Sequence, residues 1–259
     1  MSYALITGAS KGIGKAIAEE LAARKVNLLL VARGEALLKE VSADLCARHG
    51  VQADYLALDL SEPDSPAQLA ALVAQKGYDV NILVNNAGYG LSGAFDSYTS
   101  KEHIDMMRVN MNVPVELSLL FIPQLKQYPQ SYILNIVSSA AYQAVPGLSV
   151  YAASKAFMLN FSRGLRYELR KTNISVTAVS PGATATDFSN RARIGRKALK
   201  AAEKFNMTPK AVAKIAVDAM FAGKTETVTG LVNKLGAFLV WLLPKGLAEK
   251  TAAGLYDMD

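Results

Sequence analysis

The segment TGASKGIG, Thr7 to Gly14, decides the fold, because it joins a short apolar run to a helical pattern. The run before it, YALIT at 3–7, is typical of a buried strand. Gly8, Gly12 and Gly14 then follow in the spacing G-x-x-x-G-x-G, whereas a simple tight turn needs only one glycine. A strand, a glycine-rich turn and a helix in this order predict a loop that holds a dinucleotide diphosphate at the helix N-terminus.

The same alternation continues along the chain. Further apolar runs lie at 26–32, 53–59, 80–86, 131–138 and 174–180, with a weaker one at 227–233, and helical patterns start near Gly12, Glu35, Pro63, Lys101, Ser149 and Pro209. Strands this apolar are buried on both faces, and helical crossovers between them make neighbouring strands parallel. We therefore predict one α/β domain over 1–259, with a doubly wound, mainly parallel seven-stranded sheet of the Rossmann type and helices on both faces.

The composition excludes several classes of protein. Of 259 residues, 51% are hydrophobic, which is enough for a sizeable core. The single cysteine, Cys46, rules out an intrachain disulfide and a cysteine-based metal cluster. Only two histidines are present, so we expect no metal site and no Ser-His-Asp triad. The net charge of +6 is spread along the chain, and we expect no nucleic-acid partner.

One local basic cluster, at 191–204, is interpreted as a solvated helix face, with contact to an anionic substrate or a membrane as the alternative. The N-terminus, MSYALITG, has no basic segment and no long apolar segment of the kind found in signal peptides. The longest apolar run, LGAFLVWLLP at 235–244, is far shorter than the roughly 20 residues that span a bilayer. We expect a cytoplasmic protein that does not insert into membranes.

The second strand ends without an acidic residue, and this predicts the type of cofactor. An NAD-binding site usually places an Asp or Glu there, against the ribose 2′-hydroxyl. Here Ala32 takes that position, Arg33 follows, and Glu35 already belongs to the next helix. Arg33 can meet a 2′-phosphate, and Lys11 adds a second cation on the same side. We predict NADP(H) rather than NAD(H), with ordinary surface cations as the alternative.

The stretch YAASK carries Tyr151 and Lys155 four residues apart, so both side chains lie on one helix face. They could simply pack there, with the lysine stem along the core. Alternatively, the lysine charge favours ionisation of a phenol whose ordinary pKa is about 10, which makes it a better acid–base catalyst. Ser138, at the end of the fifth strand, can point into the same crevice. By contrast, GYGLSG at 88–93 matches G-x-G-x-x-G but opens no helix, and we interpret it as a mobile loop near the site.

Taken together, these motifs resemble the short-chain dehydrogenase/reductase family, in its compact single-domain branch. The matching residues are TGASKGIG, Asp59, the NNAG at 85–88, Asn110, Ser138, YAASK and the PGATAT at 181–186. They extend to about residue 190. The resemblance implies a homodimer or homotetramer and a hydride transfer between NADP(H) and a carbonyl or alcohol. The family's epimerase-like branch shares the Tyr–Lys pair but has a differently spaced glycine motif and a longer chain.

The resemblance also implies a role for each matching residue. Tyr151 would be the proton donor, Lys155 would hold the nicotinamide ribose and favour the phenolate, and Ser138 would bind the substrate oxygen. Asn110 would sit at a helix irregularity and hold a water that connects Lys155 to solvent. The implied cofactor contacts are Gly8, Ser10, Lys11, Gly12, Ile13, Gly14, Arg33, Asp59, Leu60, Asn86, Ala87, Gly88, Tyr151, Lys155, Pro181, Gly182, Thr184 and Thr186.

Substrate selection is expected from three segments without family motifs: YGLSGAF after NNAG, AAYQAVPGL at 140–148, and a lid over 187–207. Their apolar residues suggest a pocket for a lipophilic substrate, or alternatively core and oligomer contacts: Tyr89, Leu91, Phe95, Tyr142, Val145, Leu148, Phe188 and Phe205. The tail at 234–259 is expected to form apolar helices over the cleft or against a second subunit, with weak membrane-surface contact as a lesser alternative.

Three functions stay open from the sequence. The first is an NADPH-dependent reductase of a lipophilic ketone or aldehyde. The second is a reductase of 3-oxoacyl thioesters of CoA or a carrier protein, whose phosphates the basic cluster would receive. The third is a regulatory protein that binds the dinucleotide without turnover. A sensor needs no proton donor, so the presence of Tyr151, Lys155, Ser138 and Asn110 favours an enzyme.

Overall fold

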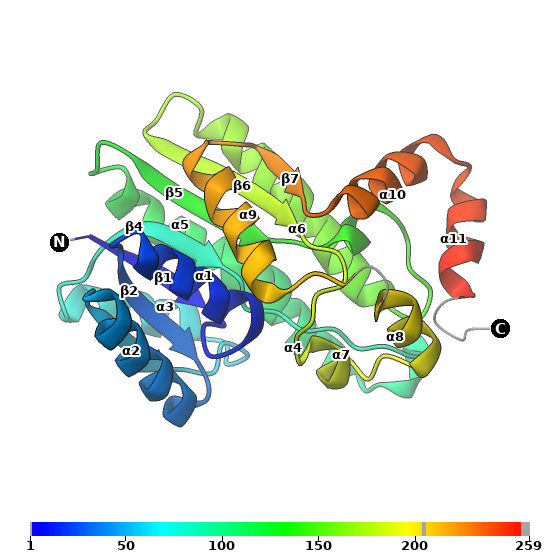
Figure 1. The fold of residues 1–259 in the computed structure, drawn as a ribbon, viewed down its shortest axis with the longest axis horizontal. Coiled ribbons are helices and arrows are strands. Elements are labelled where there is room, and N and C mark those ends of the chain that lie inside the picture. The colour runs from blue at the N-terminus through cyan, green and yellow to red at the C-terminus, as the bar shows by residue number, and fades with distance from the viewer. Residues whose placement is uncertain (1, 204–205, 255–259) are drawn as a thin grey trace.

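The computed structural model describes residues 2–203 and 206–254, and Figure 1 shows their arrangement. A single sheet of seven strands runs through the described part in the order β3-β2-β1-β4-β5-β6-β7, and every pair is parallel. The strands are β1 Ser2–Thr7, β2 Asn27–Ala32, β3 Ala53–Ala57, β4 Asp79–Asn85, β5 Ser131–Ile136, β6 Ile174–Ser180 and β7 Glu226–Val228. This confirms the predicted doubly wound parallel sheet.

Helices cover both faces of the sheet. One face carries α1 Gly12–Ala23, α2 Glu35–His49 and α9 Pro209–Phe221, which pack on it through residues such as Ile17, Leu38 and Val217. The other face carries α3 Ser65–Gln75, α5 Val113–Leu125 and α6 Ser149–Glu168, with Leu69 and Leu117 among the packed residues. Because both faces are buried, the central strands are mainly apolar, and this is the pattern that identified them in the sequence. The edge strand β3 is less buried and exposes Asp54.

The strand order reverses between β1 and β4, which pair with each other while their chain neighbours lead to opposite edges of the sheet. The loops after these two strands therefore diverge and leave a crevice at the carboxyl ends of the strands. In doubly wound sheets this is the place where ligands bind. The loop after β1 is the glycine-rich segment, and the loop after β4 is the NNAG segment.

The seventh predicted strand is only partly correct. The structure has a short strand at Glu226–Val228, and α10 begins at Leu231 and runs to Leu242. The apolar run TVTGLVN misled the prediction because it contains β-branched residues on both sides of Gly230. That glycine has a φ of 78°, which turns the chain out of the sheet and starts a helix.

The helix after β4 is interrupted by a π-helical turn. α4 Ser100–Met107 runs into a π-helical segment at Arg108–Asn112, and α5 follows. In a regular α-helix the carbonyl of Asn110 would accept a hydrogen bond from the N–H of residue 114. Residue 114 is proline and has no N–H to donate. The helix irregularity that family resemblance implies at Asn110 is therefore present, and Pro114 gives a physical reason for it.

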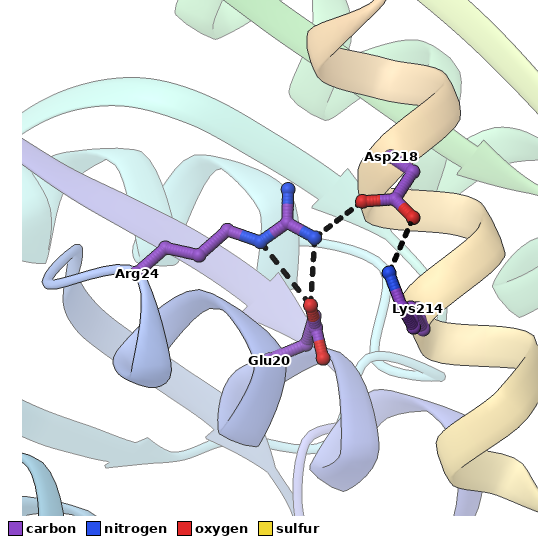
Figure 2. A network of polar contacts seen from close by, with 4 residues as sticks. All are labelled: Glu20, Arg24, Lys214 and Asp218. Atoms are coloured by element: carbon purple, nitrogen blue, oxygen red, sulfur yellow. Dashed lines mark hydrogen bonds and ion pairs between the residues drawn. The ribbon is translucent and has the colours of Figure 1, made fainter.

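A cluster of charges joins α1 to α9, as Figure 2 shows. The Arg24 guanidinium lies 2.7 Å from Glu20 on its own helix and also pairs with Asp218 of α9. Asp218 in turn accepts a hydrogen bond of 2.8 Å from Lys214. The Arg24 guanidinium carbon also lies 5.5 Å from the centre of the Phe221 ring. These contacts tie the helix that follows the glycine-rich loop to the helix that follows the predicted lid.

The remaining helices lie at the end of the molecule away from the N-terminus (Figure 1). They are α7 Phe188–Arg191 and α8 Arg196–Glu203 in the predicted lid, and α10 and α11 Lys245–Ala253 in the predicted tail. Phe205 and residues 255–259, to which parts of these predictions refer, lie outside the described residues. Among the residues that are described, no helix has both the length and the apolar character needed to cross a membrane.

Candidate active site

A cleft of about 900 Å³ opens at the carboxyl ends of the strands. It is lined by most of the residues that the sequence predicted for the site: Gly8, Ser10, Lys11, Gly12, Ile13, Arg33, Asp59, Leu60, Asn86, Ala87, Gly88, Ser138, Tyr151, Lys155, Pro181, Gly182, Thr184 and Thr186. Gly14 and Asn110 lie behind this lining. Residues far apart in the sequence therefore converge on one cavity, as expected for a dinucleotide and a substrate that share a site.

The floor of the cleft is the glycine-rich loop, which leaves no room for a side chain at Gly8 or Gly14. Gly8 and Gly12 have φ values of 68° and 57°, a region that favours glycine. A Cβ on Gly14 would lie 2.2 Å from the Gly8 carbonyl oxygen and 2.4 Å from the Asn86 amide nitrogen. That Asn86 nitrogen donates hydrogen bonds to the carbonyls of Thr7, at 2.9 Å, and Gly8, at 3.2 Å. The β4 loop thus fixes the shape of the glycine-rich loop.

The N-terminus of α1 faces this loop. No side chain caps it, and its first turn contains no acidic residue. Its free backbone N–H groups and the positive end of the helix dipole are available to an anion. The loop and the helix together therefore fit the diphosphate of a dinucleotide.

Two ion pairs mark the end of the cleft near β2 and β3. Arg33 lies 3.7 Å from the Asp59 carboxylate, and Lys11 lies 3.7 Å from the carboxylate of Asp187 in the predicted lid. All four side chains are well exposed. Partial burial raises the pKa of Asp59, but hydrogen bonds from Ser61 and the nearby Arg33 charge outweigh it and hold that pKa below its usual value. Both cations predicted for a 2′-phosphate thus lie at the cleft.

Arg191 is a cation in the cleft lining that the sequence analysis did not assign to the site. It belongs to the cluster at 191–204, which we interpreted as a solvated helix face. Its guanidinium carbon lies 4.2 Å from the centre of the Tyr89 ring, and its charge interacts with those of Arg33 and Asp59. Only the packing of α7 across the cleft brings these residues together. Arg196, Lys197 and Lys200 of α8 are exposed and lie outside the cleft lining, as the solvated-face interpretation expects.

Tyr151 and Lys155 lie one helical turn apart near the start of α6, and both are buried. The Lys155 ammonium lies 5.9 Å from the centre of the Tyr151 ring and donates a hydrogen bond of 3.0 Å to the carbonyl of Ile136. Burial lowers the pKa of Lys155 to about 8. At neutral pH the lysine is therefore still mostly protonated, and its charge is available to the tyrosine.

Asn110 organises the loop that faces Lys155. Its side-chain nitrogen donates to the Tyr89 carbonyl at 2.9 Å and to the Ser154 hydroxyl at 3.0 Å, and its oxygen accepts from the Tyr89 N–H at 3.1 Å. A Cβ on Gly88 would lie 3.0 Å from the Asn110 oxygen and 3.3 Å from the Lys155 ammonium. Asn110 therefore holds the backbone of the β4 loop close to Lys155. The water that would link Asn110 to Lys155 stays a prediction.

Ser138 follows β5 and also lines the cleft. Its hydroxyl oxygen accepts a hydrogen bond of 3.1 Å from the N–H of Ala140, which starts the short 3-10 helix at Ser139–Tyr142.

The Phe188 ring of α7 lies 5.3 Å from the Tyr151 ring, centre to centre. The segment predicted to be a lid thus packs beside the tyrosine.

The loop after β6 forms the other wall of the cleft. A Cβ on Gly182 would lie 2.2 Å from the side-chain nitrogen of Asn233, so α10 packs directly on this loop. Asn233 is held there by a hydrogen bond of 2.7 Å to the Thr229 carbonyl. Thr186 lies close to Gly12, whose Cβ would be 3.1 Å from the threonine methyl group. No local pattern predicts the Asn233 contact, because it depends on how α10 folds back onto the loop.

The predicted apolar substrate residues divide into two groups. Tyr89, Leu148 and Phe188 line the cleft. The others contribute elsewhere: Leu91 and Val145 pack in the cluster around Met106, and Phe95 is 67% exposed. The Tyr142 hydroxyl donates a hydrogen bond to Glu226 and accepts one from the Ser180 hydroxyl. In the part of the chain that is described, no group of three or more His, Cys, Asp or Glu side chains could hold a metal ion.

Comparison with known proteins identifies the family. The family profile described as short chain dehydrogenase matches residues 2–197. The chain therefore belongs to the short-chain dehydrogenase family, and its seven-stranded parallel sheet has the Rossmann fold of that family.

Individual relatives are similar over much of the chain. A very-long-chain 3-oxoacyl-CoA reductase of Anas platyrhynchos is 33% identical over 73% of this chain and 61% of its own length. An inactive hydroxysteroid dehydrogenase-like protein 1 of Homo sapiens is 33% identical over 72% of this chain and 57% of its own. This chain thus spans about 60% of the length of these relatives. A short-chain dehydrogenase from Sphingobium yanoikuyae in complex with NADPH matches 95% of both chains, with 30% identity and a TM-score of 0.82.

Proposed function

We propose that this protein uses NADP(H) to interconvert a lipophilic ketone or aldehyde and the corresponding alcohol, with Tyr151 as proton donor and acceptor. The observation that carries the proposal is the buried pair of Tyr151 and Lys155 beside a cleft whose floor is the glycine-rich loop. If Tyr151 and Lys155 served only for packing, a buried lysine charge would be unexpected, because burial of a charge is costly. The pair is instead explained by proton transfer.

The cleft fits the proposed cofactor. The glycine-rich loop has no room for side chains at Gly14 and suits a diphosphate, while Asp59 and Leu60 would contact the adenine. Arg33 and Lys11 would bind a 2′-phosphate by exchanging their present carboxylate partners for it. Pro181, Gly182, Thr184 and Thr186 would face the nicotinamide. The NADPH complex of the Sphingobium relative supports the preference for NADP(H).

When bound, the nicotinamide cofactor supplies the hydride that reduces the carbonyl carbon. The residues of this chain supply the proton and the electrostatics. Tyr151 would donate its hydroxyl proton to the carbonyl oxygen, which Ser138 would hold by a hydrogen bond. The Lys155 ammonium would stabilise the phenolate that Tyr151 becomes after it gives up its proton, because opposite charges attract strongly in a buried site. Asn110 would fix the loop that carries Gly88 against Lys155.

Proton delivery back to Tyr151 follows from the same arrangement. The pKa of Lys155, about 8, lies close to neutral pH, so its ammonium can lose and regain a proton during turnover. The lipophilic character of the substrate is supported by Tyr89, Leu148 and Phe188 in the cleft lining. The lid at 187–207 would close over the substrate, because α7 already packs beside Tyr151.

The decisive experiment follows NADPH consumption with short and long ketones, aldehydes and 3-oxoacyl thioesters. Wild type and Tyr151→Phe are compared, with NADH as the control cofactor. We expect at least one carbonyl to be reduced, with NADPH preferred, and a loss of about 10²- to 10⁴-fold in turnover for the variant without loss of NADPH binding. A silent Tyr151→Phe would refute the assignment of the proton donor and favour the non-catalytic alternative.

A 3-oxoacyl thioester is a second candidate substrate. It is favoured by the similarity to the 3-oxoacyl-CoA reductase of Anas platyrhynchos and by the exposed basic residues of α8, Arg196, Lys197 and Lys200. Those cations could receive the phosphates of CoA or of a carrier protein. Turnover of a 3-oxoacyl-CoA at a rate far above that of the matching free ketone would establish this candidate. Equal rates for the two would exclude it.

A further inference from the structure

Helix α10 exposes an unusual amount of apolar surface. Leu231 is 82% exposed, Trp241 74% and Leu242 62%. Other large apolar side chains of the helix are exposed as well: Val232, Leu235, Phe238 and Leu239, followed by Leu243 and Leu247 just beyond it. Soluble domains rarely leave a contiguous apolar patch of this kind uncovered, and such patches mark interaction sites.

The exposed residues cover a wide arc of the helix. At about 100° per residue, the exposed apolar side chains from Leu231 to Leu242 span about 180° of the circumference, and Lys234 lies near one edge of this arc. The other side of the helix, which includes Asn233 and Val240, is partly covered by the protein. A coiled-coil seam is narrower than this arc. A helix that is half immersed in an apolar phase presents such a broad face.

From the start of α10 to Leu247, every charged residue is a lysine. Between Glu226 and Glu249 the chain contains no acidic residue, whereas Lys234 and Lys245 are both exposed. Lys245 follows the proline that ends α10, and its ammonium lies 3.5 Å from the Val240 carbonyl. Trp241 and Phe238 lie together near this end, with ring centres 6.2 Å apart. An aromatic pair flanked by lysines matches the boundary between acyl chains and anionic headgroups.

The helix is also held firmly to the body of the protein. Asn233 packs on the loop of Gly182 at one end, and α11 returns to the body at the other. There Ala248 and Ala252 are buried, and Ala252 belongs to the apolar cluster that contains Tyr151. The apolar arc is therefore presented outward at the end of the molecule, where Figure 1 shows α10 and α11.

We propose that α10 docks on the surface of anionic phospholipid membranes, lying in the interface with its apolar arc among the acyl chains and its lysines at the headgroups. The binding is peripheral, because α10 is too short to cross a bilayer. Docking on lipid does not require turnover of a redox substrate. A second copy of the chain could cover the same arc, and the experiment below distinguishes it from a lipid surface.

Trp241 gives a direct readout, because it is the single tryptophan of the chain. Protein without cofactor is mixed with vesicles of phosphatidylcholine, with or without phosphatidylserine, and tryptophan emission and flotation are recorded. We expect a blue shift and flotation with the anionic vesicles, and weaker binding with phosphatidylcholine alone. Lys234→Gln/Lys245→Gln should remove that difference between the two lipids.

Phe238→Gln/Leu242→Gln tests the apolar arc and keeps the tryptophan. We expect at least about tenfold weaker vesicle binding, because burial of one large apolar side chain is worth about that factor. Leu119→Gln is the matched control: Leu119 is 71% exposed on α5, far from α10 in the sequence, and its change should leave vesicle binding intact. Unchanged NADPH affinity and thermal midpoint show that the variants are folded.

Two results would overturn the proposal. The first is vesicle binding that is absent in wild type, or equal in wild type and Phe238→Gln/Leu242→Gln. The second is a blue shift that appears without vesicles as protein concentration rises, with a dimer mass in light scattering that the double variant reduces to a monomer. The second result would assign α10 to an interface between two copies of the chain.

Discussion

Replacing Lys155 by methionine should make the protein without cofactor more stable at neutral pH, although it removes a residue that we propose for catalysis. Methionine keeps the length and apolar stem of lysine but carries no charge. The pKa of Lys155 falls from 10.5 to about 8 because the side chain is buried. At about 1.4 kcal/mol per pKa unit, holding the charged lysine in the folded state costs about 3 kcal/mol. Loss of the hydrogen bond to Ile136 offsets about 1 kcal/mol of this, which leaves a net gain of about 2 kcal/mol.

The pH dependence has a defined sign. Below about pH 8, Lys155 is charged in both the folded and unfolded states, so the full cost of burial is present. Between pH 8 and 10.5 the folded protein has lost the proton while the unfolded chain still binds it, and the cost declines as the pH rises. At about pH 10 the remaining cost is about 1 kcal/mol, which the lost hydrogen bond cancels. The stabilising effect of Lys155→Met should therefore disappear near that pH.

The assay is urea unfolding of wild type and Lys155→Met at pH 7 and pH 10, without cofactor. Lys126→Met, at the exposed end of α5, controls for the loss of a surface lysine and should give the same difference from wild type at both pH values. The reasoning is refuted if Lys155→Met is less stable than wild type at pH 7. It is also refuted if the difference between the two proteins does not change with pH.

Three further predictions test other parts of the structure. Gly182→Ala should lower the free energy of unfolding by about 1–3 kcal/mol, because its Cβ would overlap the Asn233 side chain. Adding Asn233→Ala should restore most of this loss in thermal or urea unfolding. A double variant as unstable as Gly182→Ala would contradict the prediction. Arg24→Ala should lower the free energy of unfolding by about 1 kcal/mol in low salt and by less in high salt, because its partners, among them Asp218, are partly exposed. Arg191 interacts with the charges of Arg33 and Asp59, so Arg191→Ala should weaken NADPH binding about tenfold and NADH binding much less. Titration of both cofactors measures the two dissociation constants. Equal effects on both would exclude a role of Arg191 at the 2′-phosphate.

Much of the fold was predictable because its signals are local. The six longer strands are mainly apolar runs of five or more residues, which is the pattern of parallel strands covered on both faces. The glycine-rich loop was predictable because only glycine fits at Gly14, where the neighbouring backbone leaves no space. The short strand β7 was placed too long because three residues of strand carry little periodicity, and the conformation of Gly230 that ends it cannot be read from the sequence.

The predicted site residues were found in the cleft because strand ends fix their positions. The carboxyl ends of parallel strands meet at one edge, so Ser138 and Asn86 had to face the same crevice. Arg191 and Asn233 were missed for the opposite reason. Both come from helices that follow irregular segments, and their neighbours Tyr89 and Gly182 are set by tertiary packing rather than by spacing along the chain.

The close packing of Asn233 on Gly182 has a thermodynamic consequence. One partner belongs to the helix that we propose for lipid binding, and the other to the loop that we propose at the nicotinamide. If the two ligands favour different positions of this contact, the affinity for one must depend on the other. Linkage is reciprocal, so a factor by which vesicles change the dissociation constant of NADPH is the same factor by which NADPH changes the dissociation constant of vesicles. A factor of one means that the two sites are not coupled, and any other value gives their coupling free energy.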